Sequence, residues 1–142
     1  MSSEGAPIVT QSGSKAYFDK AFAVRNTITP DRLAKSGKKA KVVGVKDTMR
    51  MSDGMRTLDI LRITGGGHSD TFLMVHLPKE KLLIEADAYT PLAPNAAPPA
   101  TPNANNVNLI ENIERRKLAV DKILPLHGRI VPMSELNRAV GR

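Results

Sequence analysis

The sequence predicts an α/β fold, with a mostly antiparallel or mixed sheet that carries helices on one of its faces. Three observations support this class: apolar residues recur at helical spacing near the start, short strand-like apolar runs fill residues 57–86, and helix, strand and helix patterns follow. The chain has 142 residues, of which 41% are hydrophobic. We therefore expect one domain, residues 1–142, with a substantial core.

The first quarter of the chain predicts one strand and two helices. Residues 8–10 are a short strand candidate, followed by a Ser-Gly-Ser turn. A second, short helix is expected to start with Thr29 as the capping residue and Pro30 in its first position, and to end by Gly37. The first helix is indicated by apolar residues at helical spacing: Tyr17, Phe18, Ala21 and Phe22.

The middle of the chain reads as a series of strands. Residues 38–54 are polar, and we expect a weak strand at 42–43 and a hairpin there. Residues 57–63 alternate as in a strand, which the glycines at 65–67 end. Residues 72–77 and 82–86 are two further strands, and the short link between them predicts an antiparallel hairpin. Both faces of this hairpin are largely apolar, so each should be covered.

The last third predicts a loop, a helix, a strand and a closing helix. Residues 91–106 are rich in Pro, Ala and Asn and predict a mobile loop. Leu109, Ile110 and Ile113 form the apolar stripe of a helix, and residues 122–126 form a strand. Residues 133–140 then form a helix that ends at Gly141.

Composition narrows the functional classes. The net charge of +7 comes from dispersed Lys and Arg, and few aromatic residues accompany them, so a nucleic-acid partner is disfavoured. No apolar run approaches the ~20 residues of a membrane span, and no membrane partner is expected. The absence of Cys excludes disulfides and thiolate metal sites. No signal peptide is visible, so a cytoplasmic location is the default expectation.

Three polar residues lie at the ends of predicted strands and are candidate metal ligands: His68, Asp87 and His127. Imidazole and carboxylate groups are the ligands of a non-thiolate zinc site, and strand ends are common places for functional side chains. Taken singly, each His beside a glycine is more often a turn residue, and Asp87 could cap a strand end. His76 alternates with apolar residues within a strand, so we expect it on the sheet surface without a role.

The order of these motifs resembles the second half of the metallo-β-lactamase superfamily, over residues 8–142. The specific stretches are Lys15–Phe18, Leu77–Lys81 and Pro125–Arg129, together with the positions of the three candidate ligands. The resemblance implies half of an αββα sandwich. It also implies that His68 binds a first zinc, that Asp87 bridges two metals, and that His127 binds the second zinc.

The family's main ligand segment, His-x-His-x-Asp-His, does not occur in this sequence. A catalytic zinc normally has three protein ligands and a water, and a two-metal site needs more donors than these three residues supply. The resemblance therefore implies a truncated or divergent member that is inactive by itself.

Two other interpretations stay open. The chain could be part of a dinuclear zinc hydrolase that a missing segment or a partner chain completes. It could instead be a non-catalytic binding module that uses its proline-rich loop and basic residues. The missing half would leave apolar sheet faces exposed, and we expect a homodimer, or a partner that supplies this half, to cover them.

Overall fold

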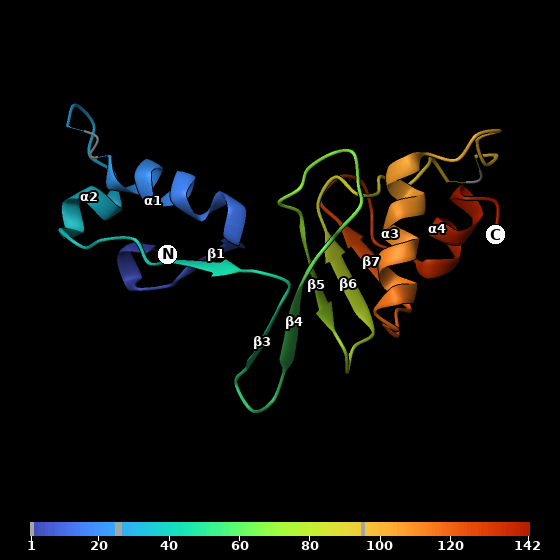
Figure 1. The fold of residues 1–142 in the computed structure, drawn as a ribbon, viewed down its shortest axis with the longest axis horizontal. Helices are drawn as coiled ribbons and strands as arrows, with labels where there is room; N and C mark the ends of the chain where they lie inside the picture. Colours follow the sequence, from blue (N-terminus) through green and yellow to red (C-terminus); the bar gives the residue numbers. More distant parts are fainter. Residues whose placement is uncertain (1, 25–26, 95) are drawn as a thin grey trace. The chain divides into compact units, whose positions relative to one another are not determined.

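A computed structural model describes residues 2–24, 27–94 and 96–142 (Figure 1). The chain separates into two compact units, Met1–Asp47 and Thr48–Arg142, and each is described by itself. Among the described residues, no helix has the length and apolar character needed to cross a membrane.

The first unit contains a two-stranded parallel sheet with short helices. Strand β1 pairs with β2, and Ile8 lies opposite Val42. The predicted strand near residue 8 and the helix over residues 17–22 are confirmed, although no residue of that helix is buried. Its elements are η1 (Ser2–Glu4), β1 (Ile8–Gln11), η2 (Ser12–Ser14), α1 (Lys15–Ala23), α2 (Arg32–Ser36) and β2 (Val42–Val45).

Two details of this unit differ from the sequence prediction. Helix α2 is capped by Asp31 and not by Thr29, because the Asp31 carboxylate accepts the backbone N–H of Ala34 at 2.8 Å. The helix ends as predicted at Gly37, whose φ of 67° is left-handed. The expected hairpin over residues 38–54 is wrong, since β2 pairs in parallel with β1.

The second unit contains a mixed six-stranded sheet in the order β3-β4-β5-β6-β7-β8. Neighbouring strands are antiparallel except β6 and β7, which are parallel and are connected through α3. This confirms the predicted α/β class with a mixed sheet. Its elements are β3 (Thr48–Ser52), β4 (Thr57–Arg62), β5 (Leu73–Leu77), β6 (Leu82–Glu85), α3 (Ala104–Arg115), β7 (Lys122–Pro125), β8 (Val131–Pro132) and α4 (Met133–Ala139).

Helix α3 begins before the predicted end of the proline-rich loop. Residues 104–106 are its first turn, and Asn103 caps it by accepting the N–H of Asn105 at 2.8 Å. The loop is therefore shorter than the expected 91–106, because an Asn cap outweighs the loop-like composition. Asn95, which belongs to this loop, lies outside the described residues.

The core of the second unit lies between the sheet and two helices. Figure 1 shows α3 and α4 on one side of the sheet. Alternate strand residues, including Met74, Leu83 and Ile123, point toward Leu109 and Leu136, and these five are at most 1% exposed. Full burial of each such side chain contributes about 1.5–3 kcal/mol. This packing fixes the strand ends that carry the candidate ligands.

The opposite face of the sheet is also apolar but is less deeply buried. Ile60, which pairs with Val75 on this face, is buried, and the other apolar residues near its middle are half-buried, namely Leu58, Val75, Leu77, Ile84 and Leu124. One face of the hairpin is thus apolar, and the other, which α3 and α4 cover, carries Met74 and Leu83 together with the polar His76 and Glu85.

His76 lies on the helix-covered face, and its expected place on the sheet surface is wrong. It is only 4% exposed, and its Nε2 lies 2.9 Å from the carbonyl oxygen of Ala119. The reason is the strand period of two: His76 shares the face of Met74, which is in the core.

Candidate metal centre

The ends of two parallel strands bring Asp87 and His127 together. In β6 and β7, Glu85 pairs with Pro125, so both strands end at the same edge of the sheet. Asp87 lies two residues after Glu85, and His127 lies two residues after Pro125. The His127 Nε2 and Asp87 Oδ1 atoms lie 2.9 Å apart. The two atoms are at hydrogen-bond distance and pair with each other, and the side chains are 61% and 41% exposed.

The turn that carries Asp87 is held by a buried carboxylate. Asp87 has a left-handed backbone with φ of 64°. The Oε2 atom of Glu85 accepts the N–H groups of Ala88 at 2.8 Å and Tyr89 at 3.1 Å. Burial raises the pKa of Glu85 to about 7, although these two N–H bonds oppose the rise. Asp87 adds to the rise and His127 lowers the pKa.

The loop after His127 makes a close approach that requires glycine. Gly128 has a φ of 102°, and a Cβ atom built there would lie 3.2 Å from Cδ of Pro91. The His-Gly pair in the sequence therefore has a structural reason. It lets the segment after β7 pass close to the start of the proline-rich loop.

His68 is not part of the Asp87–His127 pair. Its side chain is exposed, and its ring packs edge-on against Phe72 with the ring centres 5.1 Å apart. It shares a narrow cavity with Ala88, the residue after Asp87. His68 therefore borders the turn of Asp87, but the structure does not join all three predicted ligands.

Helix α3 positions the glycine turn that precedes His68. The side chain of Asn112, which is fully buried, accepts the N–H of Thr64 at 3.0 Å and donates to its carbonyl at 3.0 Å. Asn108 donates to the same carbonyl at 2.9 Å. A Cβ at Gly66 would lie 2.9 Å from the Asn108 Oδ1 atom, so a side chain there would push the Asn108 amide aside.

The sequence reasoning missed Glu85, Asn108 and Asn112. Asn112 stands next to Ile113 in the apolar stripe of α3, and Glu85 ends a strand of apolar residues. A polar residue within an apolar pattern is the signal that could have found both.

The Asp87–His127 pair does not form a metal site by itself. Two donors bound at ~2.0–2.1 Å to one tetrahedral zinc lie about 3.3 Å apart. The observed 2.9 Å between Nε2 and Oδ1 is shorter and is the distance of a direct hydrogen bond between the two side chains, which a metal ion would have to replace. Within the part of the chain that the structure describes, no group of three His, Cys, Asp or Glu residues could hold a metal ion.

A cavity of about 410 Å³ lies beside Asp87. Its walls combine the proline-rich loop with the first turn of α3, and they mix apolar residues with uncharged polar ones. Besides Asp87, they include Tyr89, Pro99, Thr101, Asn103 and Asn106.

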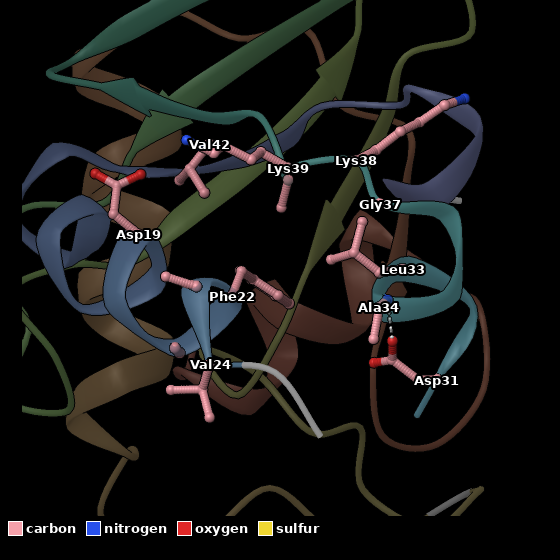
Figure 2. A pocket seen from close by; sticks show the side chains of 13 residues that line it. Asp19, Phe22, Val24, Asp31, Leu33, Ala34, Gly37, Lys38, Lys39 and Val42 are labelled. Carbon is pink, nitrogen blue, oxygen red and sulfur yellow. Dashed lines mark hydrogen bonds between the residues drawn. The ribbon is translucent and has the colours of Figure 1, made fainter. Parts of the chain in front are cut away.

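Figure 2 shows a larger cavity, of about 600 Å³, in the first unit between α1, α2 and residues 37–42. Its lining mixes apolar side chains with lysines and two carboxylates, and it contains no histidine. Its two carboxylates already have partners: Asp31 caps α2, and Asp19 binds Lys15 at 2.6 Å. This cavity therefore lacks a metal-binding donor set, and the candidate chemistry lies in the second unit.

No protein-family model matches the sequence, and no curated protein matches it. Among solved structures, a metallo-β-lactamase from Pontibacter korlensis matches with a TM-score of 0.58 and 18% identity, over 96% of this chain and 57% of that one. An archaeal metallo-β-lactamase superfamily protein from Sulfolobus tokodaii matches with a TM-score of 0.60 and 17% identity, over 94% and 56%. Rubredoxin:oxygen oxidoreductase from Desulfovibrio gigas matches with a TM-score of 0.61 and 19% identity, over 94% and 36%.

These similarities show the fold. The chain has part of a metallo-β-lactamase-type fold, which confirms the resemblance predicted from the order of its motifs. It spans little more than half of the first two structures and about a third of the third.

Proposed function

We propose that this chain, which has part of a metallo-β-lactamase-type fold, holds part of a zinc centre and is not a hydrolase by itself. The observation that carries this proposal is the pair of exposed donors, Asp87 Oδ1 and His127 Nε2, at 2.9 Å. His68, at the border of the same turn, is the third proposed ligand.

The chemistry of a bound zinc sets the limits of this function. Zinc acts as a Lewis acid and lowers the pKa of its bound water toward ~7. The residues of this chain hold and orient the ion: Asp87 supplies a carboxylate oxygen and His127 an imidazole nitrogen. Catalytic zinc normally has three protein ligands. One carboxylate and one imidazole therefore support binding of the ion without supporting turnover.

The identity of the metal is part of the proposal. One matching structure is a flavo di-iron protein from Thermotoga maritima, with a TM-score of 0.60 and 17% identity over 95% of this chain and 36% of that one. Imidazole and carboxylate donors suit both zinc and iron. We propose zinc, and the test therefore includes ferrous iron.

The remaining donors would come from a second copy of this chain or from a partner that supplies the other half of the fold. The half-buried apolar face of the sheet, which includes Val75 and Leu124, supports such a partner. A complete two-metal hydrolase would then exist only in the assembly.

Zinc stoichiometry tests the metal proposal. The protein is loaded with zinc or, under anaerobic conditions, with ferrous iron, dialysed exhaustively and analysed for metal per chain. We expect about one zinc per chain at most, with loss of the metal in His127→Ala and Asp87→Asn. Loss in His68→Ala as well would include that residue among the ligands.

Asp121→Asn is the matched control, since Asp121 is an exposed carboxylate that binds Lys81 at the opposite end of β7. It should retain the wild-type metal content. Wild-type protein that keeps no zinc, or zinc that persists in both His127→Ala and Asp87→Asn, would contradict the proposal. If the protein retains iron in preference to zinc, the proposed metal is wrong and iron takes its place.

A further inference from the structure

Glu85 is one of two buried carboxylates among the described residues, and its hydrogen bonds differ from those of the other. Asp59 is 7% exposed and binds the guanidinium of Arg50. Glu85 is 3% exposed and accepts two backbone N–H groups, those of Ala88 and Tyr89. A buried carboxylate is costly unless its hydrogen bonds compensate. These two bonds therefore tie the side chain firmly to the turn.

The turn that Glu85 holds contains a strained residue. Asp87 is not a glycine, yet its φ is 64°, a conformation that L-residues rarely adopt. The N–H groups of the next two residues both point to Oε2 of Glu85. Such a conformation persists where the surrounding structure imposes it. The Glu85 side chain supplies this constraint.

Glu85 also connects this turn to the segment that carries His127. Its backbone carbonyl accepts the N–H of Leu126 at 2.9 Å. One residue therefore fixes the Asp87 turn through its side chain and the His127 segment through its main chain. The main-chain bond survives any substitution that keeps the strand, so a side-chain variant isolates the first contribution.

We propose that Glu85 is a positioning residue for Asp87: its buried carboxylate holds the left-handed turn that places the Asp87 oxygen beside His127. The predicted effect of Glu85 on metal binding rests on the proposed function. Its consequence for the turn can be measured without any metal.

The geometry predicts that glutamine at position 85 keeps the turn in place, whereas alanine does not. Both N–H groups bind the same oxygen, Oε2, while Oε1 has no hydrogen-bond partner among the described residues. A glutamine can place its single carbonyl oxygen at the Oε2 position. Glu85→Gln should therefore keep the turn, and Glu85→Ala should release it.

Hydrogen exchange of the Ala88 and Tyr89 backbone amides, measured by NMR on metal-free protein, is the first readout. We expect exchange at least tenfold faster in Glu85→Ala and within about threefold of wild type in Glu85→Gln. Asp59→Ala is the control, because it removes the other buried carboxylate from the same face of the sheet. Equal acceleration in Glu85→Ala and Asp59→Ala, or none in Glu85→Ala, would overturn the proposal.

Zinc affinity, measured by competition with a chromophoric chelator, is the second readout. We expect at least tenfold weaker binding for Glu85→Ala, and near wild-type binding for Glu85→Gln and Asp59→Ala. Unchanged affinity in Glu85→Ala would overturn the positioning role while the zinc centre stands. A wild-type chain that binds no zinc would overturn the proposed function and the predicted effect of Glu85 on metal binding. The hydrogen-exchange result would still show whether Glu85 holds the turn.

Discussion

At the scale of single residues, the two buried carboxylates of the sheet show how neighbouring groups determine the pKa of a carboxylate. The hydrogen bonds of Arg50 to Asp59, at 2.6 and 2.8 Å, lower the pKa of Asp59. Burial opposes this effect, and electrostatic interactions with Arg50 and His76 add to it. Among the described residues no arginine binds the Glu85 carboxylate, and burial raises its pKa to about 7. The difference comes from the cross-strand neighbour and not from the residue type.

Asp59 should make the folded state sensitive to acid. Because its pKa is lower in the folded than in the unfolded chain, its contribution to stability is present above the unfolded pKa of about 4 and is lost as the pH falls through the folded value. We expect the loss of unfolding free energy between about pH 5 and pH 2 to be smaller in Asp59→Asn than in wild type. Urea unfolding at several pH values measures this.

Arg50→Gln is the companion variant, because it removes the partner and leaves the carboxylate. Its acid sensitivity in the same range should also decrease. An unchanged pH dependence in both variants would show that the Arg50–Asp59 pair has no effect on acid stability.

At the scale of elements, α3 does more than cover the sheet. Its apolar stripe, Leu109, Ile110 and Ile113, packs into the core, as the sequence predicted. The same side of the helix carries Asn112, which binds both backbone groups of Thr64. One helix therefore packs the sheet and also fixes the glycine turn that leads to His68.

Replacement of Asn112 by Ala should destabilise the second unit by about 2 kcal/mol, since it leaves the Thr64 N–H without its side-chain acceptor and the Thr64 carbonyl with only the Asn108 donor. The free energy of unfolding, measured with urea, tests this. Asn106→Ala, at a half-buried position of the same helix, is the control and should change stability by about 0.5 kcal/mol or less. Equal stability of the two variants would show that the contacts to Thr64 contribute little.

At the scale of the whole molecule, the sheet has two apolar faces and helices on one of them. The other face, with Leu58, Val75 and Leu124 near its middle, is half-buried. Large apolar patches are uncommon on proteins that stay monomeric. This supports the proposal that a second copy of the chain packs on this face, because a twofold interface uses the same surface of both copies.

Val75→Lys should shift the assembly to monomer, because a charge in the middle of an apolar interface would be buried without a partner. Sedimentation velocity at micromolar concentration should show a dimer for wild type and a monomer for the variant. Glu111→Lys, on the exposed side of α3, is the control and should stay dimeric. A well-folded wild-type monomer would contradict the dimer.

The sequence by itself determined the element types and the fold class, because helix and strand periods and turn residues are local properties of the chain. It also placed Asp87 and His127 just after strand ends. The tertiary structure decided which of these residues meet. Parallel pairing of β6 with β7 joins segments that are about 40 residues apart, and no local pattern specifies that partner. The same holds for the burial of His76, the parallel pairing of β2, and the hold of Glu85 on the Asp87 turn, since each depends on contacts that form only when distant segments pack together.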